Sequence, residues 1–105
     1  MKSNPSGNIQ ALAALVSQIP FGNCTSYGRL GQALPRPVSG FLVGRWMSQL
    51  PEGHPWWRVV SKDGSLPIDK LAPHLALEQR QLLEREGVPF DGDRIDMQAC
   101  YYDPI

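Results

Sequence analysis

The sequence is short of cysteine, carries no net charge and has no long apolar run. Its two cysteines stand far apart among 105 residues and do not form the close-spaced pair of a metal or redox site. No apolar stretch approaches the roughly 20 residues that cross a membrane, and Met1 to Pro5 lack the apolar core of a secretory signal. We therefore expect a monomer in a bacterial-type cytoplasm, with no cofactor, no metal and no membrane partner.

Cys24 and Cys100 fit the common fate of free cysteine, which is burial as a small apolar side chain. A disulfide between them stays open as an alternative, although a reducing cytosol disfavours it. Neither interpretation makes the two thiols a metal site.

The charges cancel in total but are separated along the chain. Residues 22–62 carry five basic side chains and one acid, a net charge of +4, whereas residues 63–105 carry four basic side chains and nine acids, a net charge of −5. Such a chain can turn a basic face to phosphates and an acidic face outward. Scattered, solvated charge explains the composition equally well. The length fits one domain, residues 1–105, with one modest core.

The first half predicts three short helices. Apolar residues recur near a 3.6-residue period over Ile9–Ile19, with Asn8 as the expected N-cap and Pro20 as the stop. A second helix is expected over residues 27–34, before the prolines of Pro35-Arg36-Pro37. A third starts at Val38 or Ser39. Two short helices joined by a tight turn predict a helix-turn-helix whose second helix recognises DNA.

The second half predicts short β segments and one helix. Residues 56–61 are β-like and residues 62–65 form a turn. Pro73 suits the first position of a helix for which Gly87 is the C′ residue. The apolar face of that helix comprises Leu75, Leu82 and Leu83. After a turn at residues 91–93 we expect an extended tail. The predicted fold is mostly α with short β segments.

Four short motifs follow one another at a specific spacing. They are Ile19-Pro20-Phe21-Gly22, Ser26-Tyr27-Gly28, Pro55-Trp56-Trp57-Arg58-Val59 and Glu86-Gly87. Together they resemble the DNA-binding domain of the O6-alkylguanine-DNA alkyltransferases over roughly residues 9–87. The resemblance implies the winged helix-turn-helix-like fold of that domain, without the N-terminal ribonuclease-like domain of the transferases.

The motif that carries the chemistry of these transferases is altered. The resemblance places Trp56 where they have the cysteine that accepts the alkyl group, and Trp57 where they have the histidine that activates it. An indole offers neither a nucleophile nor a transferable proton at neutral pH. Glu86 is kept but lacks both groups that it would serve. Since Cys24 matches a buried apolar position and Cys100 lies in the tail, the resemblance implies an alkyltransferase-like protein that is not an enzyme.

The resemblance also implies a lesion pocket. Trp56 is expected to line it, where base–aromatic contact is worth about 1–3 kcal/mol; alternatively, its indole only fills the space of a lost site. Neighbouring residues on a strand face opposite ways, so Trp57 is expected in the core. Tyr27 is expected to help rotate the nucleotide out, with a buried core tyrosine as the alternative. Arg58 is expected behind the pocket, bonded to neighbouring carbonyls, and the Val59 carbonyl is expected to face the guanine amino group.

The recognition helix departs from the transferases, which carry Ala-Arg-Ala-Val-Gly there. This chain has Gly40-Phe41-Leu42-Val43-Gly44, so Phe41 replaces the arginine that fills the gap left by the flipped base. Phe41 either wedges between base steps or points into the core. Gly40 and Gly44 allow close approach of a DNA backbone or of another helix, and Arg45 is expected near the DNA backbone. Contacts of backbone N–H groups to phosphate are expected at Thr25, Ser26 and Gly28.

The predicted function is a non-enzymatic sensor that binds O6-alkylguanine in duplex DNA through the minor groove and flips the base. The resemblance suggests nucleotide excision repair, through its damage-recognition ATPase, as a partner. Ser65-Leu66-Pro67-Ile68 lacks the loop that closes over the base in transferases, which implies a more open pocket for bulkier adducts. The alternatives are a transferase with a relocated nucleophile and a helix-turn-helix DNA-binding or interaction module without lesion recognition.

Overall fold

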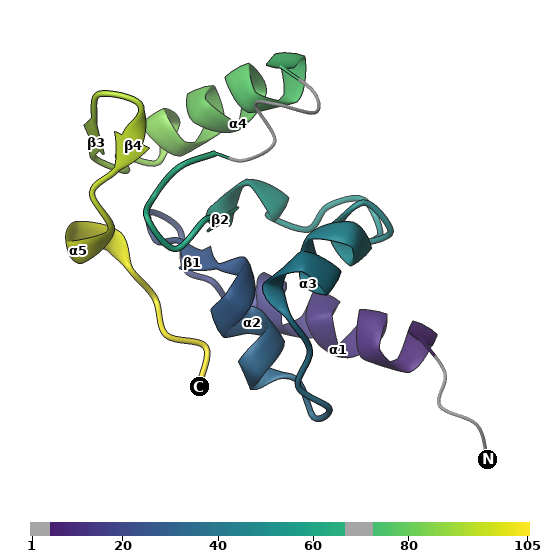
Figure 1. The fold of residues 1–105 in the computed structure, drawn as a ribbon. Coiled ribbons are helices and arrows are strands. Elements are labelled where there is room, and N and C mark those ends of the chain that lie inside the picture. The colour runs from purple at the N-terminus through teal and green to yellow at the C-terminus, as the bar shows by residue number, and fades with distance from the viewer. Residues whose placement is uncertain (1–4, 67–72) are drawn as a thin grey trace.

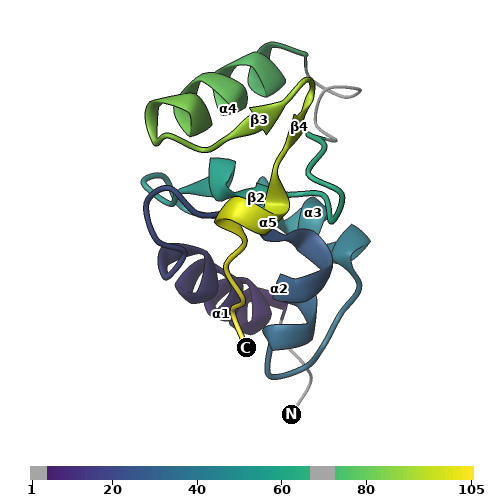
Figure 2. The ribbon, with the colours of Figure 1, turned by 90° about the vertical axis from the view of Figure 1, so that its left-hand side faces the viewer.

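Helices lie on two sides of a central pair of short parallel strands, Thr25–Ser26 and Val59–Val60 (Figures 1 and 2). The computed structural model describes residues 5–66 and 73–105. The helices of these residues are α1 (Pro5–Ser17), α2 (Tyr27–Ala33), α3 (Gly40–Met47), the 3₁₀ turn η1 (Trp56–Arg58), α4 (Pro73–Arg85) and α5 (Met97–Cys100). The strands are β1 (Thr25–Ser26), β2 (Val59–Val60), β3 (Phe90–Asp91) and β4 (Arg94–Ile95). The predicted mostly helical fold with short strands is confirmed.

Helix α1 begins earlier than the sequence predicted. It starts at Pro5, so Asn8 lies inside the helix and its predicted role as N-cap is wrong. Proline is well suited to the first helical turn, because its missing N–H has no partner there in any case. The predicted apolar period is confirmed, since Leu12 and Val16 are fully buried.

Helices α2 and α3 form the predicted helix-turn-helix. Ser26 caps α2 and Ser39 caps α3, and each side-chain oxygen accepts a backbone N–H bond of 3.2 Å from the residue three positions on. The turn between them is closed by a 3.1 Å bond from the N–H of Val38 to the carbonyl of Gly31. Such hydroxyl caps satisfy donors that helix ends leave without partners.

Gly40 brings the starts of α2 and α3 together. A Cβ at Gly40 would lie 2.8 Å from the backbone nitrogen of Gly28, closer than packing allows. At Gly44 a Cβ would meet only the ring of Tyr27, at 3.9 Å. Of the two interpretations of this glycine pair, Gly40 therefore serves tight helix packing, whereas Gly44 leaves open surface.

The segment predicted as β-like over residues 56–61 is only partly a strand. Residues 56–58 form η1, closed by bonds from the N–H of Arg58 to Pro55 and of Val59 to Trp56. Only Val59 and Val60 extend, pairing in parallel with Thr25 and Ser26 as β2 with β1. The prediction failed because aromatic and β-branched side chains favour strands only where the backbone is free to extend.

Helix α4 ends as predicted. The N–H of Gly87 donates to Glu84 at 3.0 Å and that of Val88 donates to Leu83 at 3.1 Å, with Gly87 at a φ of +80°. This is a Schellman motif, in which a left-handed glycine lets the chain bond the last carbonyls and turn away. Leu83 is fully buried, as its place on the predicted apolar face requires.

The C-terminal tail is not fully extended. The hairpin β3–β4 is followed by the short helix α5, and the chain then returns beside β1. Cys24 and Tyr101 form an isolated bridge, with the N–H of Tyr102 donating to the carbonyl of Cys24 at 2.8 Å. Sequence periodicity missed α5 because one helical turn is too short to show a repeat.

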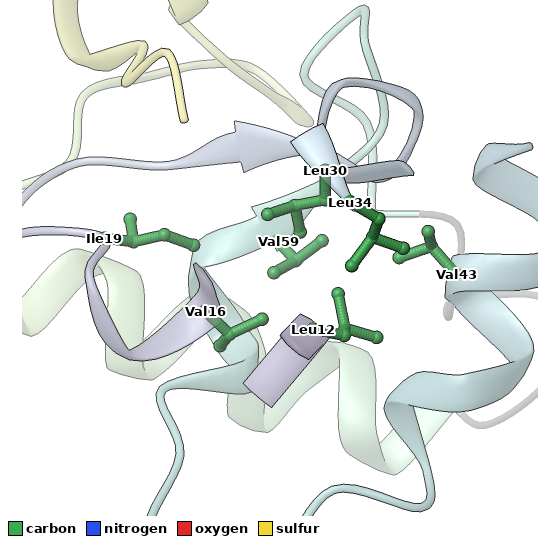
Figure 3. Close-up of a cluster of buried hydrophobic side chains, with 7 residues drawn as sticks. All are labelled: Leu12, Val16, Ile19, Leu30, Leu34, Val43 and Val59. Carbon is green, nitrogen blue, oxygen red and sulfur yellow. The ribbon is translucent and has the colours of Figure 1, made fainter. Parts of the chain in front are cut away.

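Two clusters of buried side chains form the core. The first joins α1, α2, α3 and β2 through Leu12, Val16, Ile19, Leu30, Leu34, Val43 and Val59, whose side chains converge in Figure 3. The second joins β2, the end of α4 and the tail, and comprises Cys24, Val60, Leu83, Val88, Ile95 and Cys100. Within the described part of the chain, no helix is long and apolar enough to cross a membrane.

Both cysteines are buried, as predicted. They belong to the second cluster, with their Sγ atoms 3.0 Å apart, and both thiols are free. Burial raises the pKa of the Cys24 thiol and that of the Cys100 thiol. Because the thiolate is the nucleophilic form, this environment suppresses their reactivity.

Candidate nucleic-acid interface

A groove of about 1050 Å³ opens beside the helix-turn-helix. Its walls come from the start of α2, the exposed side of α3, the 50–54 loop, η1 and the start of α4. The lining residues are Tyr27, Gly28, Gly40, Phe41, Gly44, Arg45, Met47, Ser48, Leu50, Pro51, Glu52, Gly53, His54, Trp56, Trp57, Ser61, Lys62, Leu75 and Glu78. Concave sites with apolar walls and a few polar groups are typical ligand-binding sites. We call this surface the groove.

The groove brings together most of the residues that the sequence singled out. They come from segments far apart in the chain, and they are Tyr27, Gly28, Phe41, Gly44, Arg45 and Trp56. Phe41 does not point into the core, because it is 76% exposed. The contact of these residues with DNA stays a prediction, but the structure places them on one surface.

Val59 and Arg58 lie outside the groove. Val59 is fully buried in the first core cluster, and its carbonyl accepts a 3.1 Å bond from Nε2 of Gln79. In this structure α4 supplies the donor to the carbonyl that was expected to accept a bond from the guanine amino group, and a contact with guanine stays a prediction. Arg58 lies behind the groove, where its guanidinium donates to the carbonyl of Ile19 at 2.8 Å. Its predicted structural role is confirmed.

One of the predicted phosphate contacts at β1 is corrected. Thr25 is fully buried, since it pairs with Val59 in the interior, and its backbone has no access to a phosphate. Ser26 is 7% exposed, and its hydroxyl oxygen accepts the N–H of Arg29, so a contact of its own N–H with phosphate stays a prediction. A serine or threonine before a helix can either cap the helix or contact a phosphate. The sequence does not distinguish these roles, whereas burial does.

Trp56 and Trp57 meet edge to face on η1. Their ring centroids are 6.1 Å apart and their planes are inclined by 85°. Both line the groove, but only Trp57 also packs against the second core cluster. The predicted division, with Trp56 toward the pocket and Trp57 toward the core, therefore holds in part. It arises from a 3₁₀ turn and not from the alternation of a strand.

Glu86 was expected to have lost both groups that it would serve, but one of the two tryptophans, Trp57, bonds to it. Its Oε2 accepts a 2.7 Å bond from the indole N–H of Trp57, and its Oε1 accepts a 2.8 Å bond from the N–H of Gly22. Arg58 pairs with the same carboxylate through Nε and through a terminal nitrogen at 2.8 Å. We call Gly22, Trp57, Arg58 and Glu86 the Glu86 network. The carboxylate thus has an indole N–H among its donors.

The Glu86 network is enclosed and charged. The side chain of Glu86 is 6% exposed and that of Arg58 is 14% exposed. Burial disfavours the charged carboxylate, but the bonds from Arg58, Gly22 and Trp57 outweigh that cost and lower the pKa of Glu86. The guanidinium also lies 5.6 Å from the ring of Trp57 and 5.8 Å from that of Phe21. The network fixes η1, and with it the wall of the groove.

Tyr27 joins the groove to the core. It is half-buried, packs against the first core cluster and lines the groove. Burial raises the pKa of its phenol, so the hydroxyl keeps its proton and can donate a hydrogen bond. Tyr27 therefore combines a core contact with a place in the groove, and its part in rotating the nucleotide stays a prediction.

Several groove residues were not predicted. The 50–54 loop contributes a carboxylate and a histidine, Lys62 follows β2, and α4 contributes Leu75 and Glu78. Leu75 and Glu78 stand three residues apart, a spacing that places them on one helix face, but the sequence does not show what this face meets. With Arg45, Lys62, Glu52 and Glu78 among its lining residues, the groove carries charges of both signs. Of the Ser65–Ile68 segment, Pro67 and Ile68 lie outside the described residues.

Known proteins resemble this chain over most of its length. The profile of the DNA-binding domain of 6-O-methylguanine DNA methyltransferase matches residues 9–88. The "DNA base-flipping protein" of Escherichia coli K12 is 37% identical over 92 residues, 85% of this chain and 69% of that protein. "Alkyltransferase-like protein 1" of Schizosaccharomyces pombe is 38% identical over 77 residues, 70% of this chain and 68% of that protein.

A solved structure has the same fold. It is the crystal structure of S. pombe Atl1 in complex with damaged DNA containing O6-carboxymethylguanine, with a TM-score of 0.80 at 21% identity. The match covers 97% of this chain and 98% of that one. The predicted alkyltransferase-type architecture is thus confirmed. This chain belongs to the family of the 6-O-methylguanine DNA methyltransferase DNA-binding domain, together with the DNA base-flipping and alkyltransferase-like proteins.

Proposed function

We propose that this chain is a non-enzymatic DNA-damage sensor. It binds duplex DNA containing O6-alkylguanine through the minor groove, with α3 as the recognition helix, and holds the flipped base in the groove. No alkyl group is transferred. The marked site then passes to nucleotide excision repair, whose damage-recognition ATPase is the proposed partner.

The observation that carries this proposal is the position of Trp56 and Tyr27 in one groove beside a helix-turn-helix. Extruding a base costs a few kcal/mol, which a protein must recover by contacts to the flipped base. Base–aromatic contact contributes about 1–3 kcal/mol for each base. An aromatic wall next to a DNA-recognition helix is therefore the arrangement that base flipping needs.

The side chains at the altered motif argue against alkyl transfer. Neither Trp56 nor Trp57 has a nucleophilic atom, and no thiol is found among the groove residues that the structure describes. Cys24 and Cys100 lie in the second core cluster, where burial raises the pKa of both. A mass increase of one methyl group on either cysteine, after incubation with methylated DNA, would contradict this part of the proposal.

The relatives support the same function. Relatives in Escherichia coli and Vibrio parahaemolyticus carry the name "DNA base-flipping protein", and the Atl1 structure contains damaged DNA. A shared fold and shared motifs make a shared mode of DNA binding the simplest expectation. The partner in excision repair follows from the family resemblance, and binding to that ATPase on lesion DNA would test it.

The direct test is a titration into matched short duplexes with guanine or O6-methylguanine at one position. The salt concentration is held constant, because phosphate contacts make affinity depend on it. The proposal expects clearly tighter binding to the methylated duplex. Equal affinities, or no binding, would instead favour a helix-turn-helix module without lesion recognition, an alternative that the zero net charge also favours.

Two groove variants locate the lesion contact. Trp56→Ala and Tyr27→Ala should each weaken lesion binding by roughly 5- to 150-fold, the equivalent of one base–aromatic contact. Tyr27 also packs on the core, so its variant needs a parallel thermal unfolding curve. Trp56 is not part of either core cluster, which makes it the cleaner probe. Unchanged dissociation constants for both variants would contradict the proposed pocket.

A further inference from the structure

Gln79 is a buried polar side chain between α4 and η1. It lies on α4 and is 1% exposed. Its Nε2 atom donates to the carbonyl of Trp57 at 3.2 Å and to the carbonyl of Val59 at 3.1 Å. One carboxamide therefore joins α4 to the backbone on both sides of Arg58.

The oxygen of the same carboxamide has no partner. Within the described part of the chain, no donor bonds to Oε1 of Gln79, although this atom is buried. Turning the amide over would place the oxygen against two carbonyl oxygens and would lose both bonds. A buried acceptor without a partner weakens a fold, and an apolar side chain of similar size would avoid that loss. What Gln79 supplies is therefore the pair of bonds to the backbone of η1.

Support from outside matters to η1, because a single 3₁₀ turn has few bonds of its own. The N–H of Arg58 donates to Pro55 and that of Val59 to Trp56, and no described side chain caps the start of the turn. Hydrogen bonds of this class have poorer geometry than those of an α-helix. Val59 closes the turn through its N–H and is held by Gln79 through its carbonyl. The bonds from Gln79 therefore oppose opening of η1.

The ring of Trp56 depends on this turn more than its neighbours do. The side chains of Trp57 and Arg58 are bonded to Glu86. The side chain of Trp56 has no hydrogen bond to a described residue, and its ring meets that of Trp57 edge to face where it lines the groove. The backbone of η1 therefore decides where the Trp56 ring points.

We propose that Gln79 is a positioning residue for lesion recognition. By holding the carbonyls of Trp57 and Val59 it keeps η1 closed, and with it the ring of Trp56 in the groove. Gln79 does not itself line the groove, so it acts through Trp56 and not by contact with the base. This inference rests on the proposed function, in which Trp56 contacts the flipped base.

Gln79→Met tests the two donor bonds, because methionine is unbranched and of similar length but has no N–H group. The variant should bind the O6-methylguanine duplex roughly 5- to 150-fold more weakly than wild type, as expected when one base–aromatic contact is lost. Its affinity for the guanine duplex should not change, since an unflipped base does not reach Trp56. Gln81→Met is the matched control, because Gln81 is exposed on α4 and does not line the groove. It should bind both duplexes as wild type does.

A double-mutant cycle separates positioning from a general effect on folding. Every protein is titrated at a temperature at which its unfolding curve shows it to be folded. Since Gln79 acts through Trp56, Gln79→Met should cause no further loss of lesion affinity in the Trp56→Ala background. Gln79→Asn keeps the amide but is one methylene group too short to reach both carbonyls. It takes the place of Gln79→Met should that variant not fold.

The inference is overturned by unchanged lesion affinity in the folded Gln79 variant, by an equal loss of affinity for both duplexes, or by losses that add in the cycle. Equal wild-type affinity for the lesion and guanine duplexes is a different result. It overturns the proposed function, and this inference with it.

Discussion

The groove and the Glu86 network lie next to each other and differ in how their side chains are partnered. Trp56 lines the groove alone, whereas Trp57 lines the groove and also bonds to Glu86. The groove exposes apolar rings to water, with Phe41 standing free of the core. The Glu86 network buries a carboxylate and satisfies it with an indole, a backbone amide and a guanidinium. A surface that awaits a ligand can leave apolar groups unpaired, whereas a buried charge cannot be left unpaired. Substitutions should therefore affect binding in the groove and stability in the network.

The largest effect should come from Glu86→Gln. The neutral amide removes the only carboxylate that the described contacts give Arg58 and turns an NH₂ group toward existing donors. Breaking one partner of a buried ion pair costs about 3–5 kcal/mol. Urea unfolding should show this loss. Glu78→Gln is the control, since Glu78 lies on α4 and is exposed in the groove, and it should stay within about 0.5 kcal/mol of wild type.

The tryptophan pair gives the sharpest contrast. Trp57→Phe removes the indole N–H bond to Oε2 of Glu86, which keeps only its bonds from Arg58, and a hydrogen bond to a charged group contributes about 1.5–3 kcal/mol. Trp56→Phe removes no hydrogen bond to the network and should change the free energy of unfolding far less. The affinity for lesion DNA should fall more in Trp56→Phe than in Trp57→Phe, when both are measured under conditions in which the variants are folded. Equal destabilisation by the two substitutions would break the distinction between groove and network.

The two glycines of α3 test the packing side of the comparison. Gly40→Ala places a methyl group 2.8 Å from the backbone of α2, and such overpacking costs about 1–3 kcal/mol. Gly44→Ala meets only the ring of Tyr27 at ordinary contact distance and gains helix propensity. Thermal unfolding should show a lower midpoint for Gly40→Ala and an unchanged or higher one for Gly44→Ala. A tolerated Gly40→Ala would contradict the close approach of α2 and α3.

The smallest effect should be the acid dependence of the network. The pKa of Glu86 is lower in the folded protein than in the unfolded chain, where it is about 4.3. The ionised carboxylate therefore stabilises the fold fully above pH 4.3, and this stabilisation is lost as the pH falls through the folded pKa. Other carboxylates also titrate there, so the measurement is the difference in unfolding free energy between wild type and Glu86→Gln. That difference should shrink below pH 4.3. A constant difference would show that the charge of Glu86 is not what stabilises the network.

Local signals in the sequence were sufficient for the helix-turn-helix and for the end of α4. Gly87 acts where it was expected, because capping depends on the conformation of a few consecutive residues. Asn8 was assigned wrongly because an N-cap residue is equally recognisable one turn inside a helix that begins earlier. The motifs also identified the groove residues Tyr27, Phe41 and Trp56, although not the contacts that hold them in place.

Tertiary structure decided everything that depends on partners distant in the chain. Thr25 and Val59 were assigned to DNA and lesion contacts, but their pairing as β1 and β2 buries both. Glu86 was expected to have lost its function, but the chain brings Trp57 within 2.7 Å of it. By itself, the sequence determined the longer helices and the family, because these depend on residue type and local spacing. Which side chains face the groove and which face the core depended on long-range packing, because burial is a property of the whole fold.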